Sequence, residues 1–533
     1  MIEKILQQLT YHSDEPLIFS TSLFLFLFLG FTLVYFLLEK KLTLRLLFVT
    51  AFSYYFYYKS SGFYFFLLAV VTVSDYFLAK GIYHFRGERR EERGERSDEV
   101  RGTGCEVRGM ESEVRGTGCE VRGTESKVRG TRCEVFLLVL SLLIDLGLLG
   151  YFKYTNFFGQ MIADCIGSNF QPLDIFLPVG ISFFTFQSLS YTIDIYRGQL
   201  KPVGSLLDYA FYVSFFPQLV AGPIVRARDF LPQIRRVPRV TSEMMARGVW
   251  FISVGLVKKC VISDYISLNF VDRVFEDPGL YSGVENLLGI YGYTLQIYCD
   301  FSGYSDMAIG IALLLGFTFP QNFNTPYVSA SVSEFWHRWH MSFSTWIRDY
   351  IYISMGGNRK GKLRTYINLF VTMLIGGLWH GANLNFVAWG GMHGLALACH
   401  KFLRSEVLHH DKHYVSHGLK RVLAVVLTFH FVCFTFIFFR NVSFDKSLLM
   451  IEQMLFNMHW ELLPGVVSGY SYVMALILIG YAIHFVPRQW KERPIALLER
   501  GGIVLECLAL VVVIYLVIQT KSSTIQPFIY FQF

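Results

Sequence analysis

A single histidine interrupts an apolar stretch of this chain and is the first candidate for chemistry. His380 lies in residues 371–393, which read VTMLIGGLWHGANLNFVAWGGMH, with Trp379 beside it and Gly377 and Gly381 close by. Ionisable groups at membrane depth are costly, so one that is present there is a functional candidate. A neutral imidazole in a dry chamber could take a proton from a hydroxyl or thiol that attacks an acyl carbonyl. The glycines would let a substrate approach, or they serve helix packing while His380 bonds to a neighbouring helix.

A second group of candidates lies in residues 331–350, which read SVSEFWHRWHMSFSTWIRDY. Ser331 and Glu334 have the spacing of a capping box, which predicts a helix that begins here. We expect this helix to lie along or just beneath the membrane surface, because apolar side chains recur on one side at helical spacing. Those side chains are Phe335, Trp339, Phe343, Trp346 and Ile347.

His337 and His340 are three residues apart, and with Glu334 they could begin a metal site. No second ExxH or HxxH pattern supports that reading, and an ion pair between Glu334 and Arg338 explains the carboxylate more simply. We therefore expect no metal. For His337, and for His393 further along, we favour a ring that backbone or neighbouring helices satisfy. No GxSxG elbow, phosphate loop or HExxH motif supports a serine nucleophile, a kinase or a zinc protease.

The composition places these residues in a membrane. Of 533 residues, 53% are hydrophobic and 17% aromatic, and the mean hydropathy is +0.40. This is more apolar surface than a soluble fold of that size can bury, which excludes a soluble secreted enzyme. The net charge is +7, but Lys and Arg fall between apolar runs, as cytoplasmic loop anchors do, so we expect no nucleic-acid partner.

Apolar stretches about one bilayer long, or somewhat shorter, predict about ten to twelve helices that cross or dip into the membrane. They lie near 17–38, 46–58, 62–79, 136–152, 175–196, 206–222, 248–266, 284–317, 365–379, 383–402, 421–438, 471–486 and 502–519. Basic residues after the first and third stretches predict cytoplasmic loops there and an amino terminus outside.

The stretch 206–222 does not fit a simple crossing. A full span there would put Arg226 and the arginines that follow it outside, against the charge rule. Pro217 and Pro223 interrupt the stretch, so we predict a segment that enters and leaves the membrane on one side. Such irregular backbone is tolerated only against protein or a water-filled cavity, which argues for an internal chamber.

A seven-residue tandem repeat built on EVRG occupies residues 99–133. Only its valine column is reliably apolar and glycine recurs in every repeat, so it lacks a coiled-coil seam and predicts a disordered linker. The expected organisation is N-terminal transmembrane helices in 1–84, a low-complexity cytoplasmic loop in 85–135, a core with both histidine motifs in 136–405, and C-terminal transmembrane helices in 406–533.

Five motifs in order resemble the membrane-bound O-acyltransferase family. They are PVGISFFTFQSLSYTIDIYRG, FFPQLVAGPIVR, YCDFSGYSDMAIGIALLLGFTFPQNFNTPY, FWHRWHMSFSTWIRDYIYISMGGNRKG and GGLWHGANLNFVAWGGMHG, and they cover roughly residues 170–405. Within the family, the likeness is greatest to the branch that takes part in alginate O-acetylation, and the branch that transfers D-alanine to teichoic acids is more distant.

The resemblance implies an all-α polytopic membrane protein, with a ring of about ten to twelve tilted, partly re-entrant helices around a central tunnel. It implies that His380, in the WHG motif, lines the tunnel as the catalytic residue, with His340 as a second member of the site. Their neighbours are candidates for lining the tunnel or binding the donor: Trp379, Trp339, Glu334, Arg338, Arg348 and Asp349.

The expected function is that of an O-acyltransferase in the bacterial cytoplasmic (inner) membrane. It would use no bound cofactor and would move an acetyl group from a cytoplasmic donor, acetyl-CoA, across the lipid bilayer toward hydroxyls of an exported or cell-surface polysaccharide. The resemblance also implies a periplasmic or extracellular hydrolase-like acetyltransferase as partner. A multi-pass transporter is an alternative, although no inverted repeat is seen, and a non-catalytic docking subunit is another.

Overall fold

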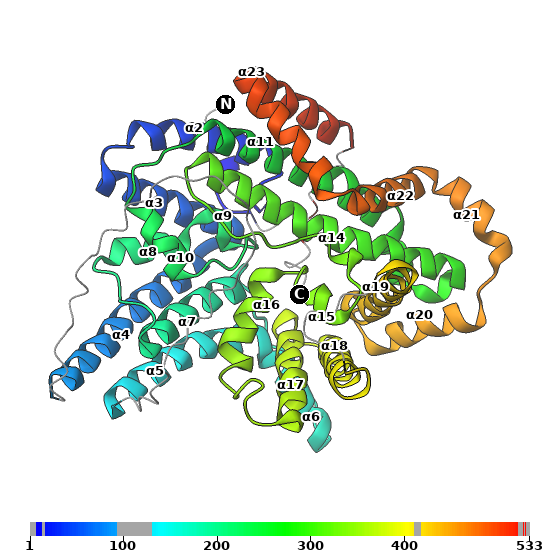
Figure 1. The fold of residues 1–533 in the computed structure, drawn as a ribbon, viewed down its shortest axis with the longest axis horizontal. Helices are drawn as coiled ribbons and strands as arrows, with labels where there is room; N and C mark the ends of the chain where they lie inside the picture. Colours follow the sequence, from blue (N-terminus) through cyan, green and yellow to red (C-terminus); the bar gives the residue numbers. More distant parts are fainter. Residues whose placement is uncertain are drawn as a thin grey trace.

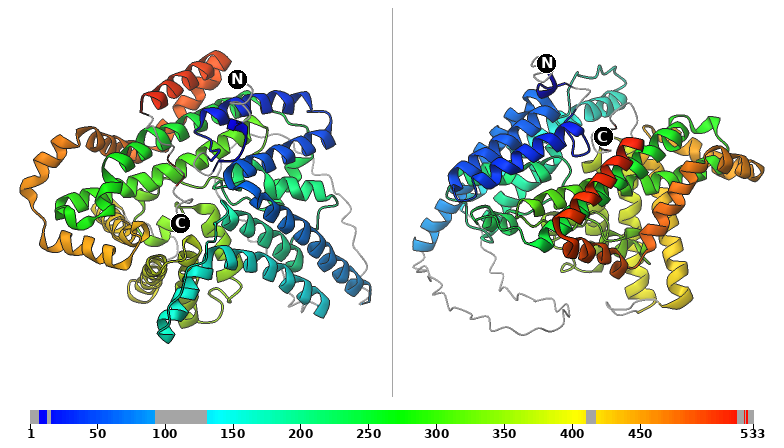
Figure 2. Two further views of the ribbon diagram at one scale, coloured as in Figure 1. Left: turned by 180° about the vertical axis from the view of Figure 1, so that it is seen from behind. Right: turned by 90° about the horizontal axis from the view of Figure 1, so that it is seen from above.

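The computed structural model describes residues 7–12, 16–92, 131–409, 417–520, 526 and 528. Within these ranges the regular elements are helices and no strand occurs. The predicted cytoplasmic linker falls mainly on 93–130, which lie outside the described residues. The helices of residues 22–92 lie together on one side of the molecule and those of residues 418–485 on the other, with the helices of residues 332–402 between them, whereas the last helix lies beside the helix of residues 242–256 (Figures 1 and 2).

The first half of the chain forms α2 (Ser22–Leu37), α3 (Leu42–Ser61), α4 (Phe65–Glu92), α5 (Arg132–Leu149), η2 (Gly150–Tyr154), α6 (Thr155–Ile166), α7 (Ile181–Arg197), α8 (Leu206–Ser214), α9 (Phe216–Leu219), α10 (Ala227–Ile234), α11 (Ser242–Leu256), α12 (Asp264–Ile266) and α13 (Asp272–Glu276). The second half forms α14 (Gly283–Leu314), α15 (Val332–Trp336), α16 (Met341–Ile347), η7 (Arg348–Tyr352), α17 (Lys362–His380), α18 (Leu384–Phe402), α19 (Gly418–Arg440), α20 (Phe444–Phe456), α21 (Leu463–Gly469), α22 (Ser471–Phe485) and α23 (Arg488–Thr520).

Four described helical stretches are long and apolar enough to cross a membrane, and a pair of helices bent by 94° would make a fifth. The four are Leu42–Gly87, Arg132–Ile166, Gly418–Arg440 and Gln489–Thr520, and the bent pair is Trp460–Gly469 with Ser471–Phe485. The expected all-α, polytopic membrane fold is confirmed. The ring of ten to twelve helices stays a prediction, because many apolar stretches form shorter or broken helices.

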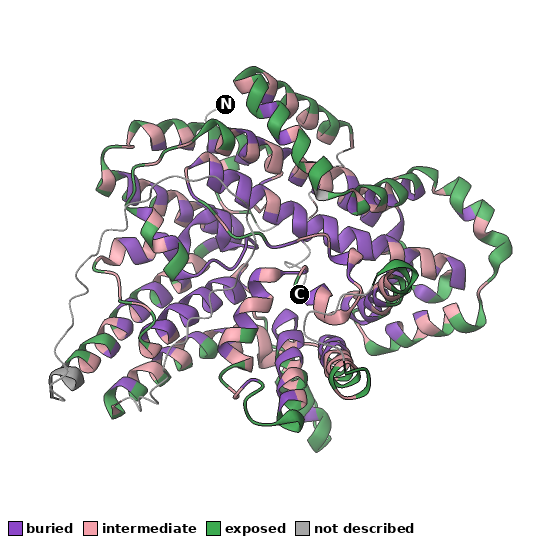
Figure 3. Cartoon of the chain, in the orientation of Figure 1, coloured by how far each residue is buried: buried purple, intermediate pink, exposed green. Residues whose placement is uncertain are grey.

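Burial divides the helices into a shell and an interior. The outer helices α20, α21 and α23 carry many exposed residues, whereas α14 and α7 are buried along most of their length (Figure 3). On α23, Val511 and Tyr515 are 62% and 60% exposed, as aliphatic and aromatic side chains in contact with lipid would be. The interior helices therefore carry the residues that the lipid does not reach.

The stretch 206–222 is broken, as the prolines predicted. It forms α8 and α9, which the backbone of Phe215 separates (φ −52°, ψ 111°). The nine residues of α8 rise about 14 Å at 1.5 Å per residue, about half the thickness of the hydrocarbon core. Residues 211–227 are buried in protein, which is where broken backbone is tolerated at membrane depth. Its entry and exit on one side stay a prediction.

The segment 331–350 begins as predicted but is not one continuous helix. Ser331 Oγ accepts a hydrogen bond from Glu334 N at 3.1 Å and caps α15. The helix then ends at Trp336, and α16 begins only after His340, whose backbone is left-handed (φ 42°). Sequence periodicity did not reveal this break, because the contacts that enforce it come from a distant segment.

The apolar side chains of this segment are covered by protein and not by lipid, and its position at the membrane surface stays a prediction. Phe335, Trp339, Phe343 and Trp346 are each at most 4% exposed. They pack inside the protein against α7, α17 and α19, for example Phe186 on Trp346 with ring centroids 3.8 Å apart. An apolar stripe at helical spacing marks burial, but it does not distinguish burial in protein from burial in lipid.

The helices α17 and α18 form a hairpin whose glycines serve close packing. A Cβ on Gly377 would lie 2.9 Å from Gly390 Cα and would collide with the carbonyl oxygen of Phe386. A Cβ on Gly390 would lie 2.5 Å from the Met373 carbonyl oxygen. Small residues at such crossings let two helix backbones approach. Of the two explanations for the glycines near His380, helix packing therefore accounts for Gly377.

We predict that Gly377→Ala lowers thermal stability in detergent by about 1–3 kcal/mol, because the new methyl group forces α17 and α18 apart. Gly391→Ala is the matched control in the same hairpin, since a Cβ there has no neighbour closer than 3.8 Å. It should leave stability unchanged or raise it by up to about 1 kcal/mol through helix propensity. Equal unfolding temperatures for the two variants would contradict the packing role.

Candidate active site

His380 is the last residue of α17, and its ring is enclosed by aromatic side chains from three other helices. The side chain is 2% exposed. Trp389 of α18 meets the ring edge-on with centroids 5.1 Å apart, Phe439 of α19 lies at 5.2 Å, and Phe343 of α16 lies at 5.4 Å. The apolar segment thus delivers an ionisable group into the protein interior and not to lipid.

His340 lies beside His380, although forty positions separate them in the chain. The two ring centroids are 6.5 Å apart. His340 is fully buried, with Phe343 stacked on it at 5.0 Å and Phe301 of α14 edge-on at 4.6 Å. Neither ring nitrogen of His340 has a hydrogen-bond partner among the described residues. Buried polar atoms are almost always satisfied, so this imidazole is suited to meeting a ligand.

The left-handed turn at His340 is held by the segment around Asn322. The backbone carbonyl of Asn322 accepts from Met341 N at 2.9 Å, and its side-chain Oδ1 accepts from Ser342 Oγ at 2.9 Å. A further bond runs from Asn324 N to the Arg338 carbonyl at 2.9 Å. A non-glycine residue in the left-handed region costs of order 1–3 kcal/mol, so it persists only where its surroundings enforce it.

The two predicted tryptophans take different places. Trp379 belongs to the histidine pair: its ring lies 4.9 Å from the ring of His380 and 6.1 Å from that of His340. Trp339 lies on another side of the segment, where its ring contacts Phe323 at 5.1 Å and Phe436 at 5.7 Å. Trp379 is therefore part of the wall that encloses both imidazoles, and Trp339 is part of the packing behind His340.

Glu334 and Arg338 form the expected ion pair at 3.0 Å. The same carboxylate oxygen of Glu334 lies 3.2 Å from Arg421 of α19, and its other oxygen accepts from Ala330 N at 2.9 Å. Arg338 also donates to the carbonyl of Asn324. These contacts fasten α15 to α19, so the structure gives Glu334 and Arg338 an architectural role and does not bring them to the two imidazoles.

Arg348 and Asp349 belong to a separate basic cluster. Asp349 is bound by Arg226 and by Arg348, each at 2.7 Å, and Arg197 donates to its backbone carbonyl at 3.2 Å. Partial burial acts to raise the pKa of the Asp349 carboxyl, but hydrogen bonds and charge from Arg348 and Arg226 outweigh it and hold that pKa below its ordinary value. A second carboxylate, Asp194, lies near Arg226 and Arg197, so three arginines face two carboxylates and the cluster keeps an excess of positive charge.

His337 and His393 have structural surroundings, as we expected. His337 is exposed, and its Nδ1 lies 2.6 Å from the carbonyl oxygen of Ser333. His393 accepts a hydrogen bond at Nδ1 from Trp336 Nε1, and its Nε2 lies 3.0 Å from Thr435 Oγ1. Across the described residues, no group of three His, Cys, Asp or Glu side chains could hold a metal ion.

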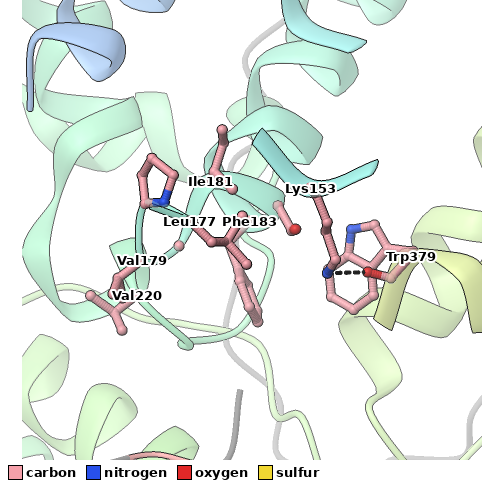
Figure 4. Close-up of a pocket in the computed structure, with 10 residues that line it drawn as sticks. Lys153, Leu177, Val179, Ile181, Phe183, Val220 and Trp379 are labelled. Carbon is pink, nitrogen blue, oxygen red and sulfur yellow. Dashed lines mark hydrogen bonds between the residues drawn. The ribbon is translucent and has the colours of Figure 1, made fainter. Parts of the chain in front are cut away.

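Sequence reasoning missed Lys153 and Tyr154, which lie in η2 at the end of a predicted span. Lys153 Nζ donates to the carbonyl of Trp379 at 2.7 Å and to that of His380 at 2.9 Å. Tyr154 donates to the carbonyl of Leu378 at 2.8 Å. Lys153 and Trp379 also line a pocket with the start of α7, and Figure 4 shows the bond between them. No local pattern could have signalled these contacts, because they join segments more than 200 residues apart.

Helix α7 relates this pocket to the basic cluster. Ile181, its first residue, lines the pocket, and Arg197, its last, contacts Asp349. Seventeen residues rise about 25 Å, a large part of the thickness of a bilayer. The molecule thus holds two buried imidazoles near one end of α7 and a positively charged cluster at the other.

Comparison with known proteins gives the following likenesses. The model of the membrane-bound O-acyltransferase family matches residues 200–440. A probable alginate O-acetylase of Pseudomonas aeruginosa is 41% identical over 369 residues, which cover 67% of this chain and 68% of that protein. A peptidoglycan O-acetyltransferase of Helicobacter pylori is 37% identical, covering 60% and 64%. A teichoic acid D-alanyltransferase of Bacillus subtilis is 31% identical, covering 50% and 69%.

We predict that Asn322→Ala lowers both stability and the reaction rate, because it removes the acceptor that holds Ser342 and frees the turn at His340. The expected loss of stability is about 1–3 kcal/mol. Asn286→Ala is the matched control: this buried asparagine donates to three carbonyls at the start of α14, away from the imidazoles. It should lose stability without losing activity per folded molecule. Equal activity of the two folded variants would contradict the role of the turn.

Proposed function

The chain belongs to the membrane-bound O-acyltransferase family and is an integral membrane O-acyltransferase, and from this premise we propose that it moves an acetyl group from a cytoplasmic donor to hydroxyls of an exported or cell-surface polysaccharide. Membership in a family of transferases favours an enzyme over the transporter and docking-subunit alternatives. The observation that carries the proposal is the buried pair of imidazoles, His340 and His380, with ring centroids 6.5 Å apart.

In this proposal His380 is the general base. It takes the proton from an acceptor hydroxyl as the hydroxyl oxygen bonds to the acyl carbonyl carbon, and a tetrahedral intermediate forms. When the intermediate collapses, the bond to the thiol of the donor breaks and the imidazolium returns the proton to that sulfur. His340 lies beside His380, and its ring nitrogens are not engaged by described residues. It can therefore orient the acyl carbonyl.

The basic cluster at the far end of α7 supports a donor that carries phosphates, such as acetyl-CoA. Arg348 is the most accessible of the three arginines, with 56% of its side chain exposed, so a phosphate in solution can reach its guanidinium, and the positive charge attracts it. Basic residues after the third apolar stretch predict a cytoplasmic loop there, and Arg86 at the start of that region bonds to the last turn of α7, so we place this end of α7 at the cytoplasm. The separation of about 25 Å from the pocket favours a donor whose acyl group sits at the end of a long arm.

The relatives indicate the acceptor. Two are named for O-acetylation, of alginate and of peptidoglycan, and a third for transfer of D-alanine to teichoic acid. A polymer outside the cytoplasmic membrane is common to all three names, so we propose such a polymer here, with acetyl as the acyl group. We further propose that residues 136–405 form the acyltransferase core in the inner membrane and that a hydrolase-like partner on the outer face passes the acyl group from the hydroxyl acylated at His380 on to the sugar.

We predict that His380→Ala lowers the formation of acetyl esters on the exported polymer at least about 100-fold, since a general base contributes about 10²- to 10⁴-fold. The measurement is ester content per cell in the intact host, normalised to the amount of the protein in the membrane. His337→Ala is the matched control, because that ring is exposed and bonded to its own helix, and it should leave the ester content unchanged. Full acetylation by His380→Ala at normal protein levels would remove the proposal.

We predict that Arg348→Gln raises KM for acetyl-CoA about 2- to 5-fold and leaves kcat unchanged, as loss of an interaction of about 0.5–1 kcal/mol at a partly exposed site would. Initial rates in inverted membrane vesicles, with the cytoplasmic face outward, measure both constants. Arg247→Gln removes an equal charge from α11, where Arg247 pairs with Glu243, and should change neither. An equal rise in KM for both variants would show a general charge effect and no donor site at Arg348.

A further inference from the structure

The last turn of α17 ends at His380, and its final carbonyl groups have no partner within the helix. A helix leaves its last four carbonyls unsatisfied. Here Leu378, Trp379 and His380 are three of these, and the next residue, Gly381, is extended (φ −164°) and does not continue the helix. Another element must therefore satisfy these carbonyls if the turn that carries His380 is to be fixed in place.

Two adjacent side chains of η2 satisfy all three. Tyr154 donates its hydroxyl to Leu378, and Lys153 donates its ammonium to Trp379 and to His380, at distances of 2.7 to 2.9 Å. The element η2 is a single π-helical turn that interrupts the passage from α5 to α6. Such turns are rare and frequent at functional sites. This one presents both donors to consecutive carbonyls of another helix.

Fastening α5 to α17 does not by itself call for these two residues. Lys153 is half-buried, and the partial loss of its hydration costs free energy that apolar side chains joining two helices would not lose. What the ammonium adds is direction: it bridges the carbonyls of the two residues whose rings contact each other at the imidazole pair. A cation at a helix C-terminus also interacts favourably with the helix dipole. The arrangement fixes where the main chain of His380 lies.

Lys153 also lines the pocket at the start of α7. Residues that line this pocket include Lys153, Trp379, Gly180, Ser182, Phe183 and Val220. Gly180 has a left-handed backbone (φ 76°), and a Cβ there would lie 2.5 Å from the Leu219 carbonyl oxygen, so this wall is backbone packed on backbone. Lys153 therefore lines the same pocket as this wall and bonds to the turn that carries His380 (Figure 4).

We propose that Lys153 and Tyr154 are positioning residues for His380, which hold the last turn of α17 so that the imidazole meets the acyl carbonyl in reacting geometry. This rests on the proposed role of His380 as base. A misplacement of about 1 Å at a reacting group can lower a rate about 100-fold. The loss of these hydrogen bonds is therefore expected in kcat, whereas KM for the donor, set at the other end of α7, stays the same.

The test compares Lys153→Met, Lys153→Arg and Tyr154→Phe by initial rates in inverted membrane vesicles with acetyl-CoA. Lys153→Met should lower kcat about 10- to 100-fold with KM for acetyl-CoA within twofold. Lys153→Arg, which can still donate to two carbonyls, should recover most of the rate. Tyr154→Phe removes one hydroxyl at nearly constant volume and should lower kcat several-fold. If the Lys153→Met protein does not accumulate in the membrane, the kcat of Tyr154→Phe tests the proposal.

Arg86→Met is the matched control. Arg86 of α4 donates to the last-turn carbonyls of α7, Ile195 and Tyr196, both at 2.6 Å, and so ends a helix in the same way without contact with His380. It should lower stability and leave kcat per folded molecule unchanged. If the variants of Lys153 and Tyr154 behave like Arg86→Met, with lower stability and normal kcat, the two residues only cap the helix and the proposal is overturned. If His380→Ala keeps full activity, the proposed function fails first and takes this inference with it.

Discussion

The rest of this structure depends on two imidazoles that lie buried side by side in an apolar, largely aromatic interior. His340 and His380 come from different elements, and neither sits in regular helical surroundings: one occupies a left-handed turn and the other ends a helix. Contacts from other segments must therefore hold each of these two backbone positions. Asn322 holds the first through the main chain of Met341 and the hydroxyl of Ser342, and η2 holds the second through three consecutive carbonyls. Packing alone would keep the rings buried, but it would not fix their mutual geometry.

Helix α7 sets the distance between the pocket beside Trp379 and the basic cluster around Asp349. Its first residue lines the pocket beside Trp379, and its last contacts the cluster of arginines around Asp349. Between them the helix is almost entirely buried, so the two ends cannot change their separation without disturbing the core. The proposed reaction takes its acyl donor from one face of the membrane and delivers the acyl group to an acceptor on the other, which requires a fixed distance between the two sites. The short, broken helices α8 and α9 are better suited to lining an internal passage than full-length membrane-spanning helices would be.

Part of this arrangement could be predicted from local patterns. The polar residue in an apolar run pointed to His380, the spacing of Ser331 and Glu334 predicted the cap, four-residue spacing predicted the pair Glu334–Arg338, and the prolines predicted the break after α8. What could not be predicted depends on contacts between distant segments. Lys153 and Asn322 read as ordinary polar residues until the fold brings them to α17 and to His340. The aromatic stripe of 335–347 predicts burial, but periodicity does not tell whether protein or lipid covers the stripe. The number of crossing helices could not be predicted for the same reason.

The central claim is that His380 faces an acyl group that reaches it from the cytoplasmic side. A structure of the protein in lipid nanodiscs with a non-hydrolysable acetyl-CoA analogue, in which a ketone replaces the thioester, tests it most directly. The account predicts the phosphates of the analogue at Arg348 and its ketone carbonyl between the rings of His340 and His380, within hydrogen-bond reach, about 3 Å, of one ring nitrogen. An analogue bound elsewhere, with both imidazoles still sealed among Phe343, Trp379 and Trp389 and no passage leading to them, would contradict it.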